Sequence, residues 1–469
     1  MKHTISLLLV VVAIASAEAI EPEAGYYTNG KLAGSLRSKQ PLAVYHADRG
    51  HLWNRVFAVF YARPSNIPAN KSEKPVQRME GGDIIDFLAW GSTTYFDQPA
   101  FVGKVEPLLD DFIRKGHQLI RQPLKRAFML RDLWAVYDFL ADKNIRRQGD
   151  VKTRKTRRRI ASKLARCIRE LALSAEAIAG LPDNYKLATQ SGSFVSKHFT
   201  DAKQPYLPFG LLSRPNEWVE IDFHQPNLHE DLSNRFITLH TRSYRGRSYF
   251  RIFYRYPGGR KAVQKHLLEL DKKGVDWKKS AQQGFIDLKK NSPQIPVGSE
   301  FALAQFMMTL DNKLRPTPTK ILESLRLRAY MNIDGSSTPA TNTGVGMNVL
   351  EYTLSRRLLF ATKRGGLRRE PDDMPQYRII FQPRNARDWG TIGRKVLFQQ
   401  CADCHMSPRA NRTGVRSVVS IVNMGGFDAG AQLGIARPMP IRKPRTRGMR
   451  AAKWKRQHET YRRLLEALE

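Results

Sequence analysis

Two cysteines and a histidine near the end of the chain have the types and spacing of a covalent cofactor site. They stand together in the pentapeptide Cys401-Ala402-Asp403-Cys404-His405. Two thiols three positions apart can each form a thioether bond to one vinyl group of a haem, and the adjacent imidazole then lies beneath the iron as the proximal ligand. The motif therefore predicts haem c held by Cys401 and Cys404, with His405 on the iron and Fe(III)/Fe(II) cycling as the chemistry.

The same two thiols have other interpretations. A structural zinc site needs four ligands, and the sequence has no second CxxC and no matching Cys/His cluster, so zinc is disfavoured. A disulfide between Cys401 and Cys404 is the stronger alternative, because exported thiols oxidise unless something occupies them. The histidine directly after the second cysteine favours haem.

The first 19 residues have the features of a secretory signal. Lys2 and His3 precede an apolar core from Ile5 to Ile14, and Ala15-Ser16-Ala17 supplies small residues for cleavage. No later stretch approaches the ~18 uninterrupted apolar residues of a membrane span. We therefore expect an exported, for example periplasmic, protein, and the sequence leaves open whether the signal segment is cleaved.

The chain is strongly basic, with 78 Lys and Arg against 43 Asp and Glu and a formal net charge of +35. Such a surface attracts anions over several ångströms. Because an exported protein rarely meets nucleic acid, the expected partners are an acidic redox protein or an anionic envelope surface. A block of bases lies opposite the apolar stripe of the helix predicted at 153–173, and it consists of Arg154, Lys155, Arg157, Arg158 and Arg159. Such a block is either a solvated helix face or a face that docks anions.

Hydrophobic periodicity predicts an α+β fold. The spacing of Leu108, Leu109, Phe112 and Ile113 begins a helical layer that continues through 124–140 and 153–173, so residues 20–204 are expected to be mainly helical. Residues 205–383 are expected to be strand-rich and mostly antiparallel, either as a separate domain or as one α+β domain with the preceding part. The predicted strands are 218–223, 235–240, 248–256, 301–310, 322–331, 349–360 and 377–381.

Two further residue patterns have a structural and a functional interpretation. Tyr249, Arg251, Phe253 and Arg255 share one face of the strand 248–256, either stacking a planar or anionic ligand or, more commonly, laying Arg across neighbouring rings. Cys167 falls on the inward face of its helix, which favours a buried thiol acting as a small hydrophobe over a reactive one.

The last ~85 residues, 384–469, resemble a small class I cytochrome c module. Gly393 and Leu397 stand eight and four positions before Cys401, as in that family. The resemblance implies a helix running into the CxxCH, crossed by a C-terminal helix at Met449 to Leu468. Five residues of that helix fall on one stripe, namely Trp454, His458, Tyr461, Leu465 and Leu468.

The same resemblance implies a methionine as the distal iron ligand. Met439 in Arg437-Pro438-Met439-Pro440 is the first candidate, because the family often sets its ligand beside proline. Met424, before Gly425-Gly426, is the rival. Another ligand or an open iron stays possible.

The mature chain as a whole resembles a group of exported bacterial proteins of unassigned activity that carry one CxxCH near the C-terminus. The stretches that carry this resemblance are 131–135, 257–261 and 354–356. We expect electron transfer by a single-haem, c-type cytochrome-like protein. One alternative is an oxidoreductase or substrate-binding enzyme with the haem as electron outlet or catalytic centre, and another is a haem-free envelope protein with a Cys401–Cys404 disulfide. The sequence does not decide between enzyme and carrier, and it identifies no donor, acceptor, substrate or oligomeric state.

Overall fold

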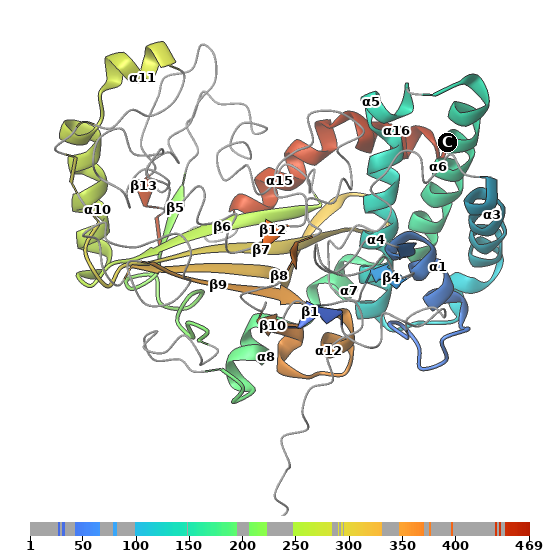
Figure 1. The fold of residues 1–469 in the computed structure, drawn as a ribbon, viewed down its shortest axis with the longest axis horizontal. Coiled ribbons are helices and arrows are strands. Elements are labelled where there is room, and N and C mark those ends of the chain that lie inside the picture. Colours follow the sequence, from blue (N-terminus) through green and yellow to red (C-terminus); the bar gives the residue numbers. More distant parts are fainter. Residues whose placement is uncertain are drawn as a thin grey trace, which may run out of the picture.

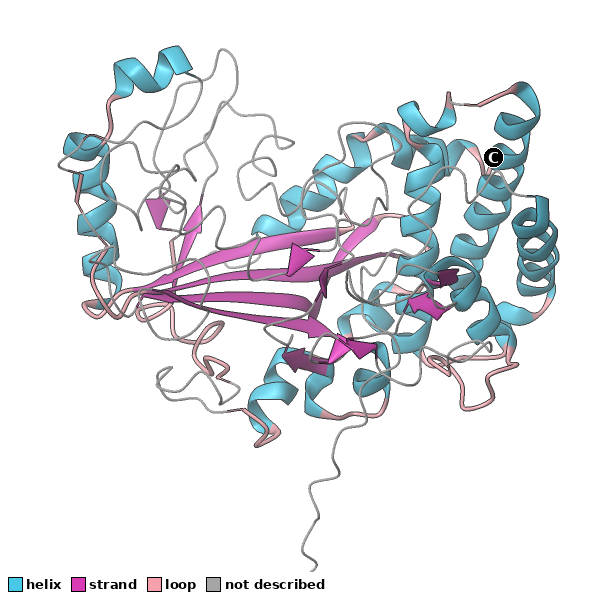
Figure 2. Cartoon of the chain, in the orientation of Figure 1, coloured by secondary structure: helices cyan, strands magenta, loops and turns pink. Residues whose placement is uncertain are grey.

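The computed structural model describes residues 43–65, 99–147, 149–194, 206–222, 247–283, 295–330, 347–369 and 446–469, with short pieces at 27–28, 31–32, 78–81, 289, 292–293, 375–376, 395–396, 437–438 and 440–441. It combines helices with one large antiparallel sheet, so the predicted α+β class is confirmed (Figure 2). The predicted signal segment, 1–19, lies outside the described residues. Among the described helices, none is long and apolar enough to cross a membrane.

The sheet has seven strands in the spatial order β10-β9-β8-β7-β6-β5-β13, and every neighbouring pair is antiparallel. Its strands are β5 (Val219–Asp222), β6 (Ser248–Arg255), β7 (Glu300–Leu310), β8 (Pro316–Tyr330), β9 (Met347–Leu354), β10 (Leu367–Arg369) and β13 (Arg437–Pro438). Three further two-stranded sheets pair β1 (Tyr27–Thr28) with β2 (Lys31–Leu32), β3 (Ala62–Ser65) with β4 (Arg78–Gly81), and β11 (Pro375–Gln376) with β12 (Lys395–Val396).

Helices gather mainly at one end of the sheet. In Figure 1, α1, α3, α4 and α6 lie together at the right, whereas α10 and α11 lie at the opposite end. The helices are α1 (Leu52–Tyr61), α3 (Pro99–Arg114), α4 (Pro123–Ala141), α5 (Lys143–Arg146), α6 (Val151–Leu171), α7 (Ala175–Ala179), α8 (Asn184–Gln190), α10 (Gly259–Glu269), α11 (Trp277–Gln283), α12 (Arg356–Phe360), α15 (Thr446–Gln457) and α16 (Glu459–Glu466). Short 3₁₀ turns stand at Gly116–Gln118 and Arg364–Gly366, and a π turn follows α10 at Leu270–Gly274.

Polar caps set several of these boundaries. The Asp150 carboxylate accepts a hydrogen bond from the Thr153 backbone N–H at 2.7 Å and starts α6, close to the predicted helix. Ser355 does the same for α12 by accepting from the Leu358 N–H at 3.2 Å. The predicted strand 349–360 is therefore wrong at its end, because this cap turns the chain into a helix after Leu354. The predicted strands 235–240 and 377–381 lie outside the described residues.

One hydrophobic cluster joins the helical and strand-rich regions. It contains Trp53 of α1, Phe112 of α3, Trp134 of α4 and Ile168 of α6 together with residues of β7 to β10, such as Phe306. Helix α4 lies at the centre of this cluster, since every residue from Ala127 to Ala141 is buried. The ionised groups of α4 must therefore find partners inside the core.

A β-bulge on β8 aims one charged side chain into the same region. Gln305 pairs with Ser324, but the next residue of β7, Phe306, pairs with Leu322, so Glu323 is the extra residue of the ladder. Asn184 of α8 bonds the backbone beside the bulge: its side chain accepts from the Leu322 N–H at 2.6 Å and donates to the Leu322 carbonyl at 3.0 Å. The bulge therefore turns Glu323 toward α4.

Candidate functional site

The residues predicted to hold haem, Cys401, Cys404 and His405, lie outside the described residues, as do the candidate distal ligands Met439 and Met424. The haem-site prediction is therefore not tested by the described residues. It does describe chain on both sides of them. Before the motif, β12 pairs with β11, and after it β13 pairs with β5 at the edge of the seven-stranded sheet.

The chain just before the motif differs from the cytochrome c pattern. The resemblance implied a helix running from Gly393 into Cys401, but Lys395 and Val396 form a short antiparallel strand with Pro375 and Gln376. The implied helix is therefore wrong at these two positions, because their backbone groups pair across to another segment instead of along a helix.

The C-terminal helix packs on the α+β core. It is broken into α15 and α16 at His458, whose ring accepts a hydrogen bond from the Thr460 N–H and caps α16. Tyr461 and Leu464 join the main hydrophobic cluster, while Ala451 and Ala452 pack with Met308 of β7. Helix α15 contacts β6 and β8, and α16 contacts α4. The resemblance implied that this segment crosses a helix of a separate haem module. In the structure, its two helices pack on the α+β core instead.

A buried ion-pair cluster fastens this C-terminal helix to α4. Lys455 Nζ of α15 lies 2.6 Å from Asp138 Oδ2, and Arg247 Nη1 lies 2.8 Å from the same oxygen. Lys455 also donates to Thr460 Oγ1 at 3.1 Å and stands 5.1 Å from the Trp134 ring centroid. Burial alone would raise the pKa of Asp138, but the two cations hold it below its ordinary value.

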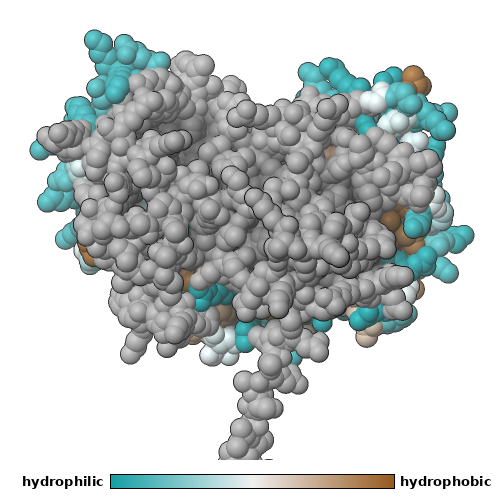
Figure 3. Space-filling view, viewed as in Figure 1, coloured by the Kyte–Doolittle hydropathy of each residue, from teal (hydrophilic) through white to brown (hydrophobic). Residues whose placement is uncertain are grey.

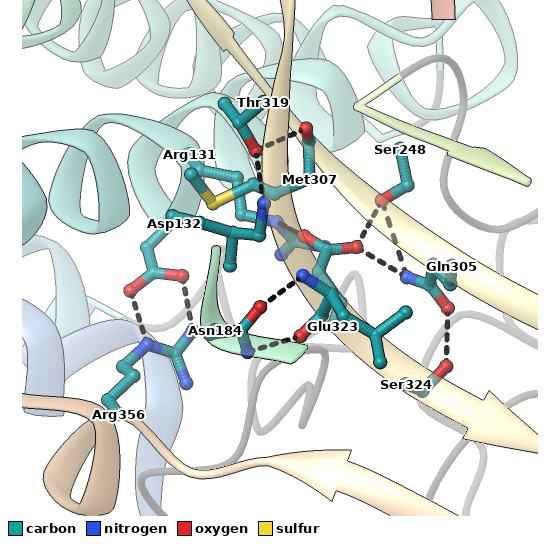
Figure 4. Close-up of polar contacts among 12 residues, drawn as sticks. Arg131, Asp132, Asn184, Ser248, Gln305, Met307, Thr319, Glu323, Ser324 and Arg356 are labelled. Atoms are coloured by element: carbon teal, nitrogen blue, oxygen red, sulfur yellow. Dashed lines mark hydrogen bonds and ion pairs between the residues drawn. The ribbon is translucent and has the colours of Figure 1, made fainter. Parts of the chain in front are cut away.

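A second buried cluster joins α4 to α12 (Figure 4). Asp132 accepts two hydrogen bonds from the Arg356 guanidinium, one of them from Nε at 2.9 Å, and a third from the Tyr45 hydroxyl at 2.7 Å. The Tyr61 hydroxyl donates to the Asp132 carbonyl at 2.9 Å. Burial and the adjacent carboxylate raise the pKa of Tyr45 far above its usual range, so this phenol stays protonated.

A third cluster joins α4 to the sheet through the β8 bulge (Figure 4). Arg131 Nε lies 2.6 Å from Glu323 Oε1, and the other oxygen of Glu323 accepts from Gln305 at 2.6 Å and from the Ser248 hydroxyl. Gln305 in turn accepts from Ser324 at 3.0 Å. Because these side chains are buried and hydrogen-bonded to one another, the cluster positions α4 on the sheet.

Sequence reasoning missed these three clusters. A signal was present in α4, where Arg131, Asp132 and Asp138 interrupt an otherwise apolar run that has no polar face. Two of the stretches that carry the whole-chain resemblance meet here, since Asp132 comes from 131–135 and Arg356 from 354–356. The third stretch, 257–261, ends β6 and starts α10, where Gly259 has φ +62° and a Cβ would lie 3.0 Å from the Asn216 carbonyl oxygen.

Two predicted structural roles are confirmed. Cys167 is buried on the inward face of α6 with its Sγ 3.9 Å from the Leu109 carbonyl oxygen, and burial raises the pKa of its thiol, so it is not a reactive cysteine. Arg251 lies over the Phe253 ring at 4.9 Å and pairs with Glu220, and Arg255 lies over Trp218 and pairs with Glu300. These two arginines stack on neighbouring rings, as the structural interpretation expected.

Among the described residues there is no group of three or more His, Cys, Asp or Glu side chains that could hold a metal ion. The chain matches no protein-family model, no curated protein and no solved structure.

Proposed function

We propose that this is an exported, single-haem, c-type cytochrome-like protein that takes part in electron transfer. The pentapeptide from Cys401 to His405 carries the proposal, since it supplies two thiols for thioether bonds and an imidazole for the iron. The haem would supply Fe(III)/Fe(II) cycling. A positively charged surface would favour an acidic redox partner or an anionic envelope surface.

The state of the third cysteine supports this assignment. The chain has three cysteines, and Cys167 is buried beneath α3 with its pKa raised, so it cannot easily exchange with another thiol. Cys401 and Cys404 thus have each other or a cofactor as their partners. In an exported protein this leaves the thioether and the disulfide as the two chemistries to be separated.

The packing of the flanking chain supports a haem carried on the body of the protein. Strand β13 extends the large sheet after the motif, and α15 is tied to α4 through Lys455 and Asp138. The described chain that follows the motif is therefore fixed to the same core as the rest of the domain.

The decisive experiment is expression with a cytochrome c maturation system, followed by pyridine haemochrome spectroscopy and intact-protein mass. We expect a Soret band and a mass increase of one haem that survives denaturation. Changing Cys401 and Cys404 together to Ser should abolish both signals, while the matched control Cys167→Ala should keep them. Colourless matured protein with a Cys401–Cys404 disulfide would instead support the haem-free alternative.

Ligand binding separates a carrier from an enzyme. A six-coordinate, cyanide-resistant haem supports electron transfer, whereas ready binding of carbon monoxide or peroxide supports chemistry at the iron. If Met439 is the distal ligand, Met439→Ala should open the iron to carbon monoxide and lower the reduction potential, and Met424→Ala should do neither. The reverse pattern would assign Met424.

A further inference from the structure

The outer face of α6 carries several cations that form no ion pair with the described residues. The apolar side of this helix, with Ile160, Leu164 and Ile168, is buried. Opposite this side lies a row of exposed bases, here called the basic stripe, formed by Lys155, Arg158, Arg166 and Arg169. The sequence suggested that these bases form either a solvated face or an anion-docking face. Arg157, which belonged to the predicted block, is buried.

The neighbouring acidic helix neutralises only one edge of α6. On α3, Glu106 pairs with Arg159 and Asp110 pairs with Lys163. Within the described part of the chain, no carboxylate pairs with Lys155, Arg158 or Arg166. Arg169 donates to the Leu468 carbonyl at 3.4 Å. Three positive charges thus point outward with no described counter-charge.

The geometry of the stripe suits a flat anionic surface. At a rise of ~1.5 Å per residue, the row from Lys155 to Arg169 extends about 21 Å along a straight helix. In Figure 3 the described atoms at the right-hand edge, over α3, α5 and α6, are mainly hydrophilic. The one apolar side chain among the exposed positions of α6 is Val151, which is 72% exposed at the start of the helix.

The composition of the stripe argues against a stable protein interface. Such interfaces have a desolvated core rich in aromatic side chains, and α6 contains no aromatic residue. Long Lys and Arg side chains on a helix can instead reach lipid phosphates with only electrostatic attraction, as polybasic segments do at anionic membranes.

We propose that the basic stripe of α6 docks the protein onto an anionic phospholipid bilayer. The inference goes beyond the proposed electron transfer and does not depend on haem, so it can be tested on the variant in which Cys401 and Cys404 are both changed to Ser. Failure of haem attachment and failure of membrane docking are therefore separate results.

The test is co-sedimentation of the full chain with vesicles of 30% phosphatidylglycerol and 70% phosphatidylcholine at low salt, with pure phosphatidylcholine vesicles alongside. We expect binding only to the anionic vesicles, weakening as sodium chloride is raised. The triple variant Lys155→Gln, Arg158→Gln, Arg166→Gln should lose about fivefold in affinity for each cation, and so roughly a hundredfold in total. Gln keeps the helix propensity of these exposed positions.

A matched control separates the stripe from net charge. Lys261, Lys272 and Lys278 are exposed on the α10–α11 end of the molecule, opposite α6 (Figure 1). Changing all three to Gln removes the same charge and should leave vesicle binding within about twofold of wild type. Equal losses in the two triple variants, or no binding to anionic vesicles by the wild type, would overturn the proposal. Stripe-dependent binding to double-stranded DNA that exceeds vesicle binding at the same salt would also overturn it.

A second measurement on the wild type avoids any folding effect of the substitutions. Amine acetylation followed by mass spectrometry should show Lys155 protected by anionic vesicles while Lys261, Lys272 and Lys278 stay reactive. Equal reactivity of Lys155 with and without vesicles would contradict docking through this face.

Discussion

Replacing Arg356 by Met tests whether the buried clusters hold α4 in place. Arg356 and Asp132 are both fully buried, and the guanidinium donates two of the three hydrogen bonds that the Asp132 side chain accepts. Met fills much of the volume but leaves a carboxylate with only the Tyr45 hydroxyl as its described side-chain partner. Removing one partner of a buried pair typically costs about 3–5 kcal/mol, a large share of the roughly 5–15 kcal/mol of a typical domain.

Urea unfolding followed by far-UV circular dichroism measures the effect. The matched control is Arg214→Met, because Arg214 and Glu217 form an ion pair whose side chains are 66% and 51% exposed. Such a pair is worth about 1 kcal/mol or less. We expect the unfolding midpoint to fall strongly for Arg356→Met and hardly at all for Arg214→Met, with an unchanged slope.

A double variant isolates the pairwise contribution. Asp132→Asn removes the buried charge and keeps an acceptor for Tyr45, so Asp132→Asn with Arg356→Met should cost clearly less than the sum of the two single changes. Additive costs, or equal midpoints for Arg356→Met and Arg214→Met, would refute the argument that charge burial makes this contact strong.

Two other changes test single features of the fold. Gly365 has φ +60°, and a Cβ there would lie 2.0 Å from the Asn184 carbonyl oxygen, so Gly365→Ala should lower the melting temperature by many degrees. Gly192 also has a positive φ but has open space around it, so the control Gly192→Ala should cost only the backbone strain. Burial lowers the pKa of His266 to about 4, so stability should be complete above the ordinary pKa of about 6.5 and fall by roughly 3 kcal/mol as the pH drops toward 4. Urea unfolding at several pH values measures this dependence; His266→Gln should flatten it, and an equal pH dependence in wild type and variant would contradict the assignment.

Sequence periodicity predicted most of the described elements but not their limits. The helix at 153–173 and the strands at 218–223, 248–256 and 301–310 correspond to α6, β5, β6 and β7, because each has an apolar face with the period of its element. The end of β9 could not be predicted from hydrophobic periodicity. There a single side-chain cap by Ser355 outweighed an apolar run that suited either a strand or a helix.

The partners of the buried charges could not be predicted from local sequence. Asp132 and Arg356 are 224 positions apart, and Lys455 and Asp138 are 317 apart, so no local window contains both members of either pair. Glu323 reaches Arg131 only because the ladder between β7 and β8 slips by one residue. Such a slip depends on cross-strand packing, which the sequence of one strand does not specify.

By itself, the sequence determined the chemistry that the chain can offer, since the spacing of Cys401, Cys404 and His405 and the excess of basic residues are properties of the covalent chain. It also determined the α+β class, because periods of 3.6 and 2 are local. Only the tertiary structure decided that the C-terminal helix packs on the α+β core, and that Lys155, Arg158 and Arg166 of α6 have no ion-pair partner among the described residues. The physical reason is that burial and ion pairing depend on which distant segment lies opposite each side chain, and that is fixed only when the whole chain packs.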